Sequence, residues 1–227
     1  MTSNPVSHTG AARILRNFHD QLMATYGPQQ WWPAQTPLEV IVGAYLTQNT
    51  SWRGVERSIA NLVERGVMNL DGLRSLNAEE LRLLIRPSGF MVRKAAALQA
   101  FVAFLDREHS GSLARLAAQP TRVLRSQLLA LPGVGEETAD AILLYALMHP
   151  VPVLDEYLRR IAARHGLAAR DRKYVEVQHL VEFSFAQDPP EFRTQLLNEF
   201  HALVVAVGKN HCGPRARCAG CPLAPFI

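Results

Sequence analysis

Two glycines in a short turn are the first residues whose type and spacing suit chemistry. Gly133 and Gly135 flank Val134, after the apolar segment 124–131 and before the segment 138–148, which has helical periodicity. Glycines tolerate a positive φ and let a ligand approach the backbone, so this stretch predicts a tight turn between two helices. The free N–H groups at the start of the second helix would form an anion site, suited to a phosphate.

A lone carboxylate, Asp155, follows this turn at the end of the short apolar run 151–154. An isolated carboxylate can stabilise positive charge and can orient or deprotonate a water molecule. Asp155 also has the position of a helix N-cap, because an arginine-rich helical segment begins near Glu156. One side chain can hold both roles.

Two adjacent tryptophans, Trp31 and Trp32, precede Pro33, which favours an extended backbone before it. Aromatic rings at such a place are either core anchors or the walls of a pocket for a flat ligand. The sequence leaves both interpretations open.

Five small polar residues, 47–51, lie between two segments of helical character and are followed by Trp52. Such a run is typical of a loop that contacts something polar, and Thr50 or Ser51 also suits an N-cap for the next helix. A second break, 86–90, places Phe90 directly after a glycine. By itself this ring suggests ordinary core packing.

Three cysteines, Cys212, Cys218 and Cys221, lie close together near the end of the sequence. Their spacing indicates a metal site rather than a disulfide framework. A tetrahedral zinc site or an iron–sulfur cluster normally has four ligands, so one is missing. His211 could complete a Cys₃His zinc site, and a vestigial site is the third interpretation.

The composition is that of a globular chain with a small net positive charge. Of its 227 residues 48% are hydrophobic, which is enough for the core of one large domain or two small ones. The net charge of +4 allows a nucleic-acid partner without requiring one. No apolar run is long enough to cross a bilayer, and the N-terminus lacks the pattern of an export signal. We therefore expect no membrane association and a cytoplasmic, nucleoid-associated location.

Helical periodicity extends along the chain, and strand-like alternation is not sustained anywhere, so the predicted fold is all-α with about ten helices. Asn77, with Glu80 three residues on, predicts a capping box between two short helices. The predicted helical segments are 11–26, 37–46, 53–63, 70–84 as two helices, 93–105, 113–131 as two helices, 138–148, 157–165, 174–184 and 191–207.

Together these stretches resemble the endonuclease III superfamily of helix-hairpin-helix DNA glycosylases. The motifs that carry the resemblance are Leu131-Pro-Gly-Val-Gly135 followed by Thr138, the loop Leu46-Thr-Gln-Asn-Thr-Ser-Trp52, Gly89-Phe90 before Lys94-Ala95, and Asp155. The resemblance implies two lobes with a catalytic cleft between them. One would be a helical barrel, 35–147, with the hairpin at 124–146. The other would join 1–34 to 148–227 and carry the cysteine tail.

The resemblance also assigns roles. Asp155 would be catalytic, Gln48 would fill the space left by an extruded base, and Phe90 would be the wedge in the DNA stack. The expected DNA contacts, by position in these motifs and in the basic tail, are Gln48, Asn49, Phe90, Gly133, Val134, Gly135, Thr138 and Lys209. The family often carries a [4Fe–4S] cluster in its cysteine tail, which makes the cluster the favoured group for the three cysteines here.

Glu137 stands where bifunctional relatives keep a Schiff-base lysine, so the resemblance implies a monofunctional glycosylase. The aromatic motifs look like those of the 3-methyladenine glycosylase III-like branch, which implies alkylated purines as substrates. The pocket residues would be Trp31, Trp32, Pro33 and Trp52. The expected partner is damaged double-stranded DNA, bound by a monomer. An oxidised pyrimidine as the substrate, and a non-catalytic DNA-binding module, are the alternatives. An RNA-binding helical protein lacks the expected aromatic motifs.

Overall fold

The computed structural model describes residues 7–29, 31–32 and 34–226, and these residues fold entirely into helices, turns and loops. In the described ranges there is no β-strand, only an isolated bridge between Cys212 and Ala216. The prediction of an all-α fold is therefore confirmed. Pro33, expected in the substrate pocket, lies outside the described residues. Across the part of the chain that is described, no helix combines the length and the apolar character needed to cross a membrane.

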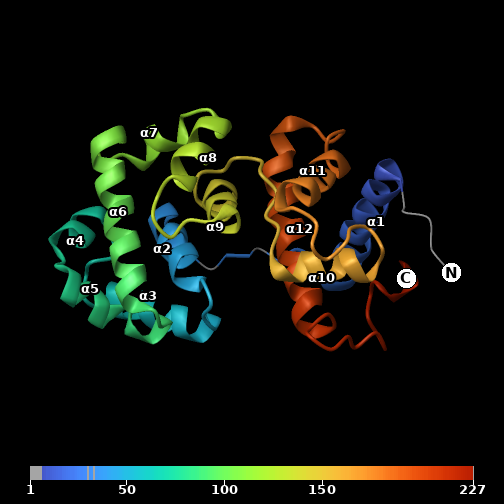
Figure 1. The fold of residues 1–227 in the computed structure, drawn as a ribbon, viewed down its shortest axis with the longest axis horizontal. Helices are drawn as coiled ribbons and strands as arrows, with labels where there is room; N and C mark the ends of the chain where they lie inside the picture. Colours follow the sequence, from blue (N-terminus) through green and yellow to red (C-terminus); the bar gives the residue numbers. More distant parts are fainter. Residues whose placement is uncertain (1–6, 30, 33, 227) are drawn as a thin grey trace. The chain divides into compact units, whose positions relative to one another are not determined.

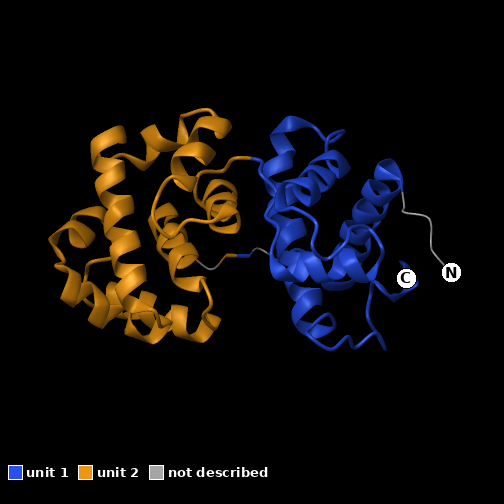
Figure 2. Cartoon of the chain, viewed as in Figure 1, with its two compact units in different colours: residues 1–31, 150–227 blue, residues 32–149 orange. Residues whose placement is uncertain are grey.

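The chain divides into two compact units (Figure 2). Unit 2 is the continuous segment 32–149, and unit 1 combines residues 1–31 with residues 150–227. Trp31 and Trp32 are neighbours in the chain but belong to different units. Unit 1 contains Asp155 and the cysteines, whereas unit 2 contains the glycine turn, the polar loop 47–51 and Phe90.

Unit 2 is built around the long helix α6, Met91–His109, which runs the length of the unit (Figure 1). The other elements of the unit are α2 Pro37–Thr47, α3 Trp52–Glu64, α4 Leu70–Ser75, α5 Ala78–Leu84, η1 Arg86–Ser88, α7 Leu113–Ala117, α8 Thr121–Leu129, α9 Glu136–Ala141 and η2 Ile142–Ala146. The apolar helix α2 is buried almost throughout, and it packs against α3, α6 and the segment η2.

Unit 1 is organised around α12, Pro190–Asn210, which packs against both α1, His8–Tyr26, and α10, Glu156–Arg164. Helix α11, Tyr174–Ser184, packs on α1. The short segment η3, Ala224–Phe226, follows the cysteine tail. Gly208 explains how closely α10 and α12 approach, because a Cβ at this position would lie 2.3 Å from Cδ1 of Tyr157.

The second arm of the glycine hairpin differs from its prediction as one uninterrupted helix over 138–148. Helix α9 begins at Glu136, ends at Ala141 and continues as the π-helical turn η2. The N–H of Leu147 bonds to the carbonyl of Ile142 at 3.1 Å, which is the wider spacing of a π-turn. All five residues of η2 are buried, so packing against α2 overrides the regular helical repeat, and periodicity could not reveal this change.

The capping box between the two short helices is confirmed. The Asn77 side chain accepts hydrogen bonds from the N–H groups of Glu79 and Glu80 at 2.9 and 3.0 Å, and the Glu80 carboxylate accepts one from the N–H of Asn77. This reciprocal pattern satisfies donors that the start of a helix would otherwise leave without a partner.

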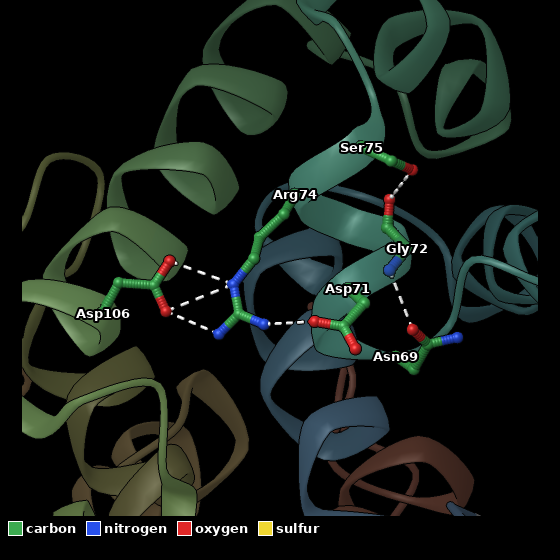
Figure 3. Close-up of polar contacts among 6 residues, drawn as sticks. All are labelled: Asn69, Asp71, Gly72, Arg74, Ser75 and Asp106. Atoms are coloured by element: carbon green, nitrogen blue, oxygen red, sulfur yellow. Dashed lines mark hydrogen bonds and ion pairs between the residues drawn. The ribbon is translucent and has the colours of Figure 1, made fainter.

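Arg74 links α4 to α6 through two carboxylates (Figure 3). Its guanidinium contacts Asp106 at 2.5 Å and Asp71 at 2.6 Å. The hydrogen bond from Arg74 holds the pKa of Asp106 below its usual range. Because water screens an exposed pair, this contact fixes the orientation of α4 more than it stabilises the fold.

Candidate functional site

Asp155 is a buried N-cap, with 8% of its surface exposed. One carboxylate oxygen, Oδ1, accepts the N–H of Leu158 at 2.7 Å, so the capping interpretation is correct. The other oxygen, Oδ2, lies 3.7 Å from Nε2 of His201. The chain before Asp155 is fixed to α11, because the N–H of Leu154 donates to the hydroxyl of Tyr174 at 3.1 Å. This carboxylate is therefore held in place from both sides.

His201, which comes from α12, is also buried, and an aromatic ring and a charged side chain lie near it. The Trp31 ring lies 5.4 Å from the His201 ring, centre to centre, at a tilt of 51°. The ammonium of Lys209, about two helical turns further along α12, lies 6.0 Å from the centre of the Trp31 ring. Unit 1 thus brings Trp31, Lys209 and Asp155 around a histidine that the sequence analysis missed. A histidine inside the apolar run of α12 was the available signal.

The two other tryptophans form a separate aromatic cluster in unit 2. Trp32 has a φ of 117° and lies 5.9 Å from the Trp52 ring in an edge-on arrangement. Tyr145, from η2, lies 5.1 Å from Trp32. A Cβ on Gly43 would lie only 3.2 Å from the Trp32 ring, so this glycine lets the indole lie against α2. The structure therefore joins Trp32 with Trp52, and it adds Tyr145, which periodicity had assigned only to a helix.

The glycine turn does not use both glycines in the same way. Gly133 has a φ of +77°, and a Cβ there would come within 3.2 Å of Cβ of Ala97. Gly135 has a φ of −95° and a ψ of 178°, extended values that any residue adopts, and open space surrounds its missing Cβ. Both glycines tolerate a positive φ, but only Gly133 adopts one. As N-cap of α9, Gly135 instead leaves the approach to the first helical turn unobstructed.

The two arms of the hairpin are tied together by a partly buried ion pair. Arg125 on α8 donates to both carboxylate oxygens of Asp140 on α9, at 2.7 and 3.0 Å. Asp140 is fully buried, and bidentate pairs of this kind fix geometry strongly. Val134, at the tip, is buried and holds the turn on the unit. The hairpin is therefore a rigid element.

Three loops of unit 2 meet at one place. The side-chain amide of Gln48 donates to the carbonyl of Gly133 at 2.8 Å and to the hydroxyl of Thr138 at 3.0 Å. Asn49, exposed with a φ of +51°, and Phe90 share a small cavity of about 60 Å³ with Gln48 and Gly133. The predicted contacts Gln48, Asn49, Phe90, Gly133 and Thr138 are thus neighbours, whereas Lys209 belongs to the other unit.

Phe90 is 60% exposed, so it is not a core residue. Its φ of +47° places it in the left-handed region as the N-cap of α6. An exposed aromatic ring on a backbone that is costly for a side chain needs support from its surroundings. This geometry contradicts core packing as its role and is compatible with a wedge.

The cysteine tail is closed by protein contacts. The guanidinium of Arg164 donates to Sγ of Cys212 at 3.0 Å and to the carbonyls of Gly213 and Pro214 at 2.9 and 3.0 Å. Cys212 is buried, Cys218 is exposed and Cys221 is half-buried. Among the described residues no group of three or more His, Cys, Asp or Glu side chains is arranged to hold a metal ion.

In the part of the chain that the structure describes, one thiol is engaged by a cation and no fourth ligand lies with the three cysteines, so this arrangement does not fit a [4Fe–4S] cluster. The iron–sulfur cluster and the zinc alternative with His211 both stay predictions. His211 is engaged in the loop itself, where its Nδ1 lies 3.0 Å from the carbonyl of Arg217.

Comparison with known proteins gives consistent matches over most of the chain. Residues 42–186 match the profile of the HhH-GPD superfamily of base excision DNA repair proteins. A protein of Methanocaldococcus jannaschii, described as an inferred DNA repair glycosylase, is 40% identical over 215 residues, which cover 94% of this chain and 95% of that protein. A thymine/uracil-DNA glycosylase of Pyrobaculum aerophilum is 28% identical over 196 residues, covering 86% of this chain and 80% of that protein.

A solved structure also matches most of the chain. The crystal structure of the H. pylori 3-methyladenine DNA glycosylase bound to 1,N6-ethenoadenine superposes with a TM-score of 0.76 at 28% identity. The superposition covers 88% of this chain and 97% of that protein.

Proposed function

Because the chain belongs to the HhH-GPD superfamily of base excision DNA repair proteins, and is thus a DNA glycosylase, we propose that Asp155 is its catalytic carboxylate. We propose further that it is monofunctional and that its substrates are alkylated purines such as 3-methyladenine. The observation that carries the proposal is the buried carboxylate beside His201, which is in turn adjacent to the Trp31 ring. A fixed carboxylate beside a flat aromatic ring suits a reaction on the sugar of a bound base.

The reaction needs the target nucleotide outside the base stack, since C1′ is not accessible inside a duplex. The bond between C1′ and the base nitrogen breaks, and its electron pair leaves with the base. Positive charge then develops on the sugar, and the Asp155 carboxylate stabilises that charge. A water molecule adds to C1′, and Asp155 accepts its proton, which leaves an abasic site in an intact strand. The capping bond from Leu158 keeps the carboxylate from rotating during these steps.

A cationic alkylpurine suits this site for two reasons. A positively charged base over an indole gains roughly 0.5–2 kcal/mol from the cation–π interaction. The approach of the Lys209 ammonium to the Trp31 ring is an example of the same attraction within this chain. A cationic base is also a good leaving group, so one carboxylate suffices. The likeness to the H. pylori 3-methyladenine glycosylase supports this choice. The Pyrobaculum relative supports a pyrimidine as the second candidate.

The DNA contacts are assigned to the three neighbouring loops of unit 2. Backbone N–H groups near Gly135 would bind a phosphate, and Phe90 would enter the stack. Gln48, which already contacts the hairpin, would fill the space that the flipped base leaves.

The monofunctional assignment depends on Glu137. This residue is exposed in the first turn of α9, and a carboxylate cannot form an imine with C1′. Borohydride should therefore trap no covalent complex with DNA, and strand breaks should need alkali. Efficient trapping would contradict the assignment.

The decisive experiment is base release from a panel of duplexes, carrying 3-methyladenine, 1,N6-ethenoadenine, an oxidised pyrimidine, uracil or thymine opposite guanine. We expect the wild-type protein to release the alkylated purines fastest. Asp155→Asn should lose at least about 100-fold in single-turnover rate, because an amide neither stabilises the cation nor accepts a proton. Its affinity for a duplex with an abasic-site analogue should stay within about threefold. A variant that keeps its rate would reduce Asp155 to a helix cap.

A further inference from the structure

Lys94 is a buried lysine that the proposed reaction does not use. It lies on the first turn of α6, and only 4% of its surface is exposed. A buried ammonium is costly unless each of its donors finds an acceptor. Here the ammonium donates to the carbonyl of Leu46 at 2.8 Å, to the hydroxyl of Thr50 at 2.6 Å and to the carbonyl of Ser88 at 2.7 Å. Three donors meet three acceptors.

These acceptors come from two separate segments. Leu46 and Thr50 bound the polar loop that carries Gln48 and Asn49, whereas Ser88 lies two residues before Phe90. Thr50 strengthens the connection, because its hydroxyl also contacts the carbonyl of Ser88. The ammonium therefore joins the loop to the turn that presents Phe90.

The Phe90 turn needs such support. Its φ is +47°, and its ring is largely exposed, so packing alone does not fix it. The Lys94 ammonium lies 5.8 Å from the centre of the Phe90 ring, within range of a cation–π interaction. Ser88, in contrast, is fully buried and gives the turn a fixed base.

We propose that Lys94 is a positioning residue for base extrusion, which locks the Phe90 wedge to the Gln48 loop so that both enter the duplex as one unit. The inference rests on the proposed function, because it requires that Phe90 contact the DNA stack. It adds a residue that acts through Phe90 and Gln48 without touching the reacting sugar. The connection continues to the hairpin, because Gln48 bonds to Gly133.

The test compares Lys94→Met, which keeps much of the volume but removes all three donors, with Arg93→Met. Arg93 is an exposed neighbour on the same turn, so its variant removes one positive charge and leaves the network intact. Single-turnover base release is measured on a normal duplex and on a duplex whose target nucleotide lies in a bulge, already unstacked. Extrusion is followed separately by the fluorescence of 2-aminopurine at the target position.

We expect Lys94→Met to lower release from the normal duplex by about tenfold and release from the bulge by less than about twofold. Arg93→Met should lower both rates by a similar factor. Phe90→Ala should reproduce the selective loss. The double variant, Phe90→Ala with Lys94→Met, should be no more than about twofold slower than Phe90→Ala alone, because residues that act as one unit are not additive. Thr50→Val, which removes one acceptor, should give a partial loss.

Equal loss on both substrates would overturn the inference, since it would reduce Lys94 to a general stabilising role. Additive losses in the double variant would overturn it as well. If Phe90→Ala leaves extrusion unchanged, the wedge assignment in the proposed function fails. If Phe90→Ala impairs extrusion and Lys94→Met does not, only the role of Lys94 fails. If Lys94→Met does not fold, Thr50→Val provides the test. A ratio of release rates from the normal and the bulged duplex that equals the wild-type ratio would then overturn the inference.

Discussion

At the scale of single residues, the chemistry depends on how each polar group is partnered. Asp155 has one oxygen fixed by a cap and the other close to His201. The capping role of Asp155 could be predicted from sequence, because it depends on the residues next to it. His201 could not, because the contact joins α10 to α12 through close packing at Gly208.

His201→Asn tests whether the histidine supports the carboxylate. The shorter amide cannot place a ring nitrogen near Oδ2 of Asp155, so the carboxylate becomes less well oriented. We expect a fall of about tenfold in single-turnover base release with unchanged affinity for an abasic-site analogue. His179→Asn, on the exposed face of α11, is the control and should keep the wild-type rate. Equal behaviour of the two variants would exclude a supporting role.

The protonation of Lys94 makes stability depend on pH. Burial lowers the pKa of Lys94 from 10.5 to about 8, so the folded chain loses this proton first as the pH rises. Between about pH 8 and 10.5 the unfolded chain binds more protons, and stability rises with pH through this group. Burial raises the pKa of the neighbouring Tyr45 above its usual range, which keeps that group neutral in this window.

Urea unfolding of the wild-type protein and of Lys94→Met between pH 7 and 10 measures this contribution. The difference in unfolding free energy should move in favour of the wild type as the pH rises through about 8 to 10. Groups common to both proteins cancel in that difference. A difference that stays constant, or that moves toward the variant, would contradict the lowered pKa.

At the scale of elements, helices with regular periodicity were the most predictable part of the chain. The helix predicted over 174–184 agrees with α11 at both ends, and the capping box at Asn77 is confirmed. The π-turn η2 was not predictable, because it results from packing on α2. The turn between α8 and α9 could be placed from its glycines, but the distinct backbone of each glycine could not.

That difference predicts different outcomes for two substitutions in the hairpin. Gly133→Ala should destabilise the fold by about 1–2 kcal/mol, because its φ is +77° and Ala97 is close. Gly135→Val should cost less, about 0.5–1 kcal/mol from the poorer N-cap, because its backbone is extended and its surroundings are open.

Gly135→Val should nevertheless weaken binding to every duplex, damaged or not, by a similar factor. Its branched side chain would stand beside the first N–H groups of α9, and phosphate contacts carry no sequence information. Thermal unfolding together with duplex titration separates the two effects. A loss of affinity limited to one lesion would show that Gly135 faces the base rather than the backbone.

At the scale of the whole molecule, the candidate functional residues are divided between the two units. Unit 2 holds the hairpin, the polar loop and Phe90, whereas unit 1 holds Asp155, His201 and the cysteine tail. The sequence motifs predicted each candidate functional segment, because each is short and local. Contacts that join distant segments, such as those of Lys94 and Arg164, needed the structure.

The cysteine tail gives the last prediction. In the family that the chain resembles, such a tail is often held by a cluster, but here Arg164 holds Cys212 and two carbonyls of the same loop. If these hydrogen bonds are sufficient, the thermal midpoint should not change on prolonged treatment with an iron and zinc chelator. Arg164→Met should lower the midpoint by several degrees, since it removes the three hydrogen bonds that hold the buried Cys212 and the two loop carbonyls.

Amide exchange in the segment 211–217 should accelerate in that variant, while exchange in α6, in the other unit, stays unchanged. Metal analysis of the freshly purified protein completes the experiment. A brown protein whose midpoint falls on chelation would contradict closure by Arg164 alone. It would mean that Sγ of Cys212 binds a metal ion in place of the hydrogen bond from Arg164, with a fourth ligand from outside the three cysteines.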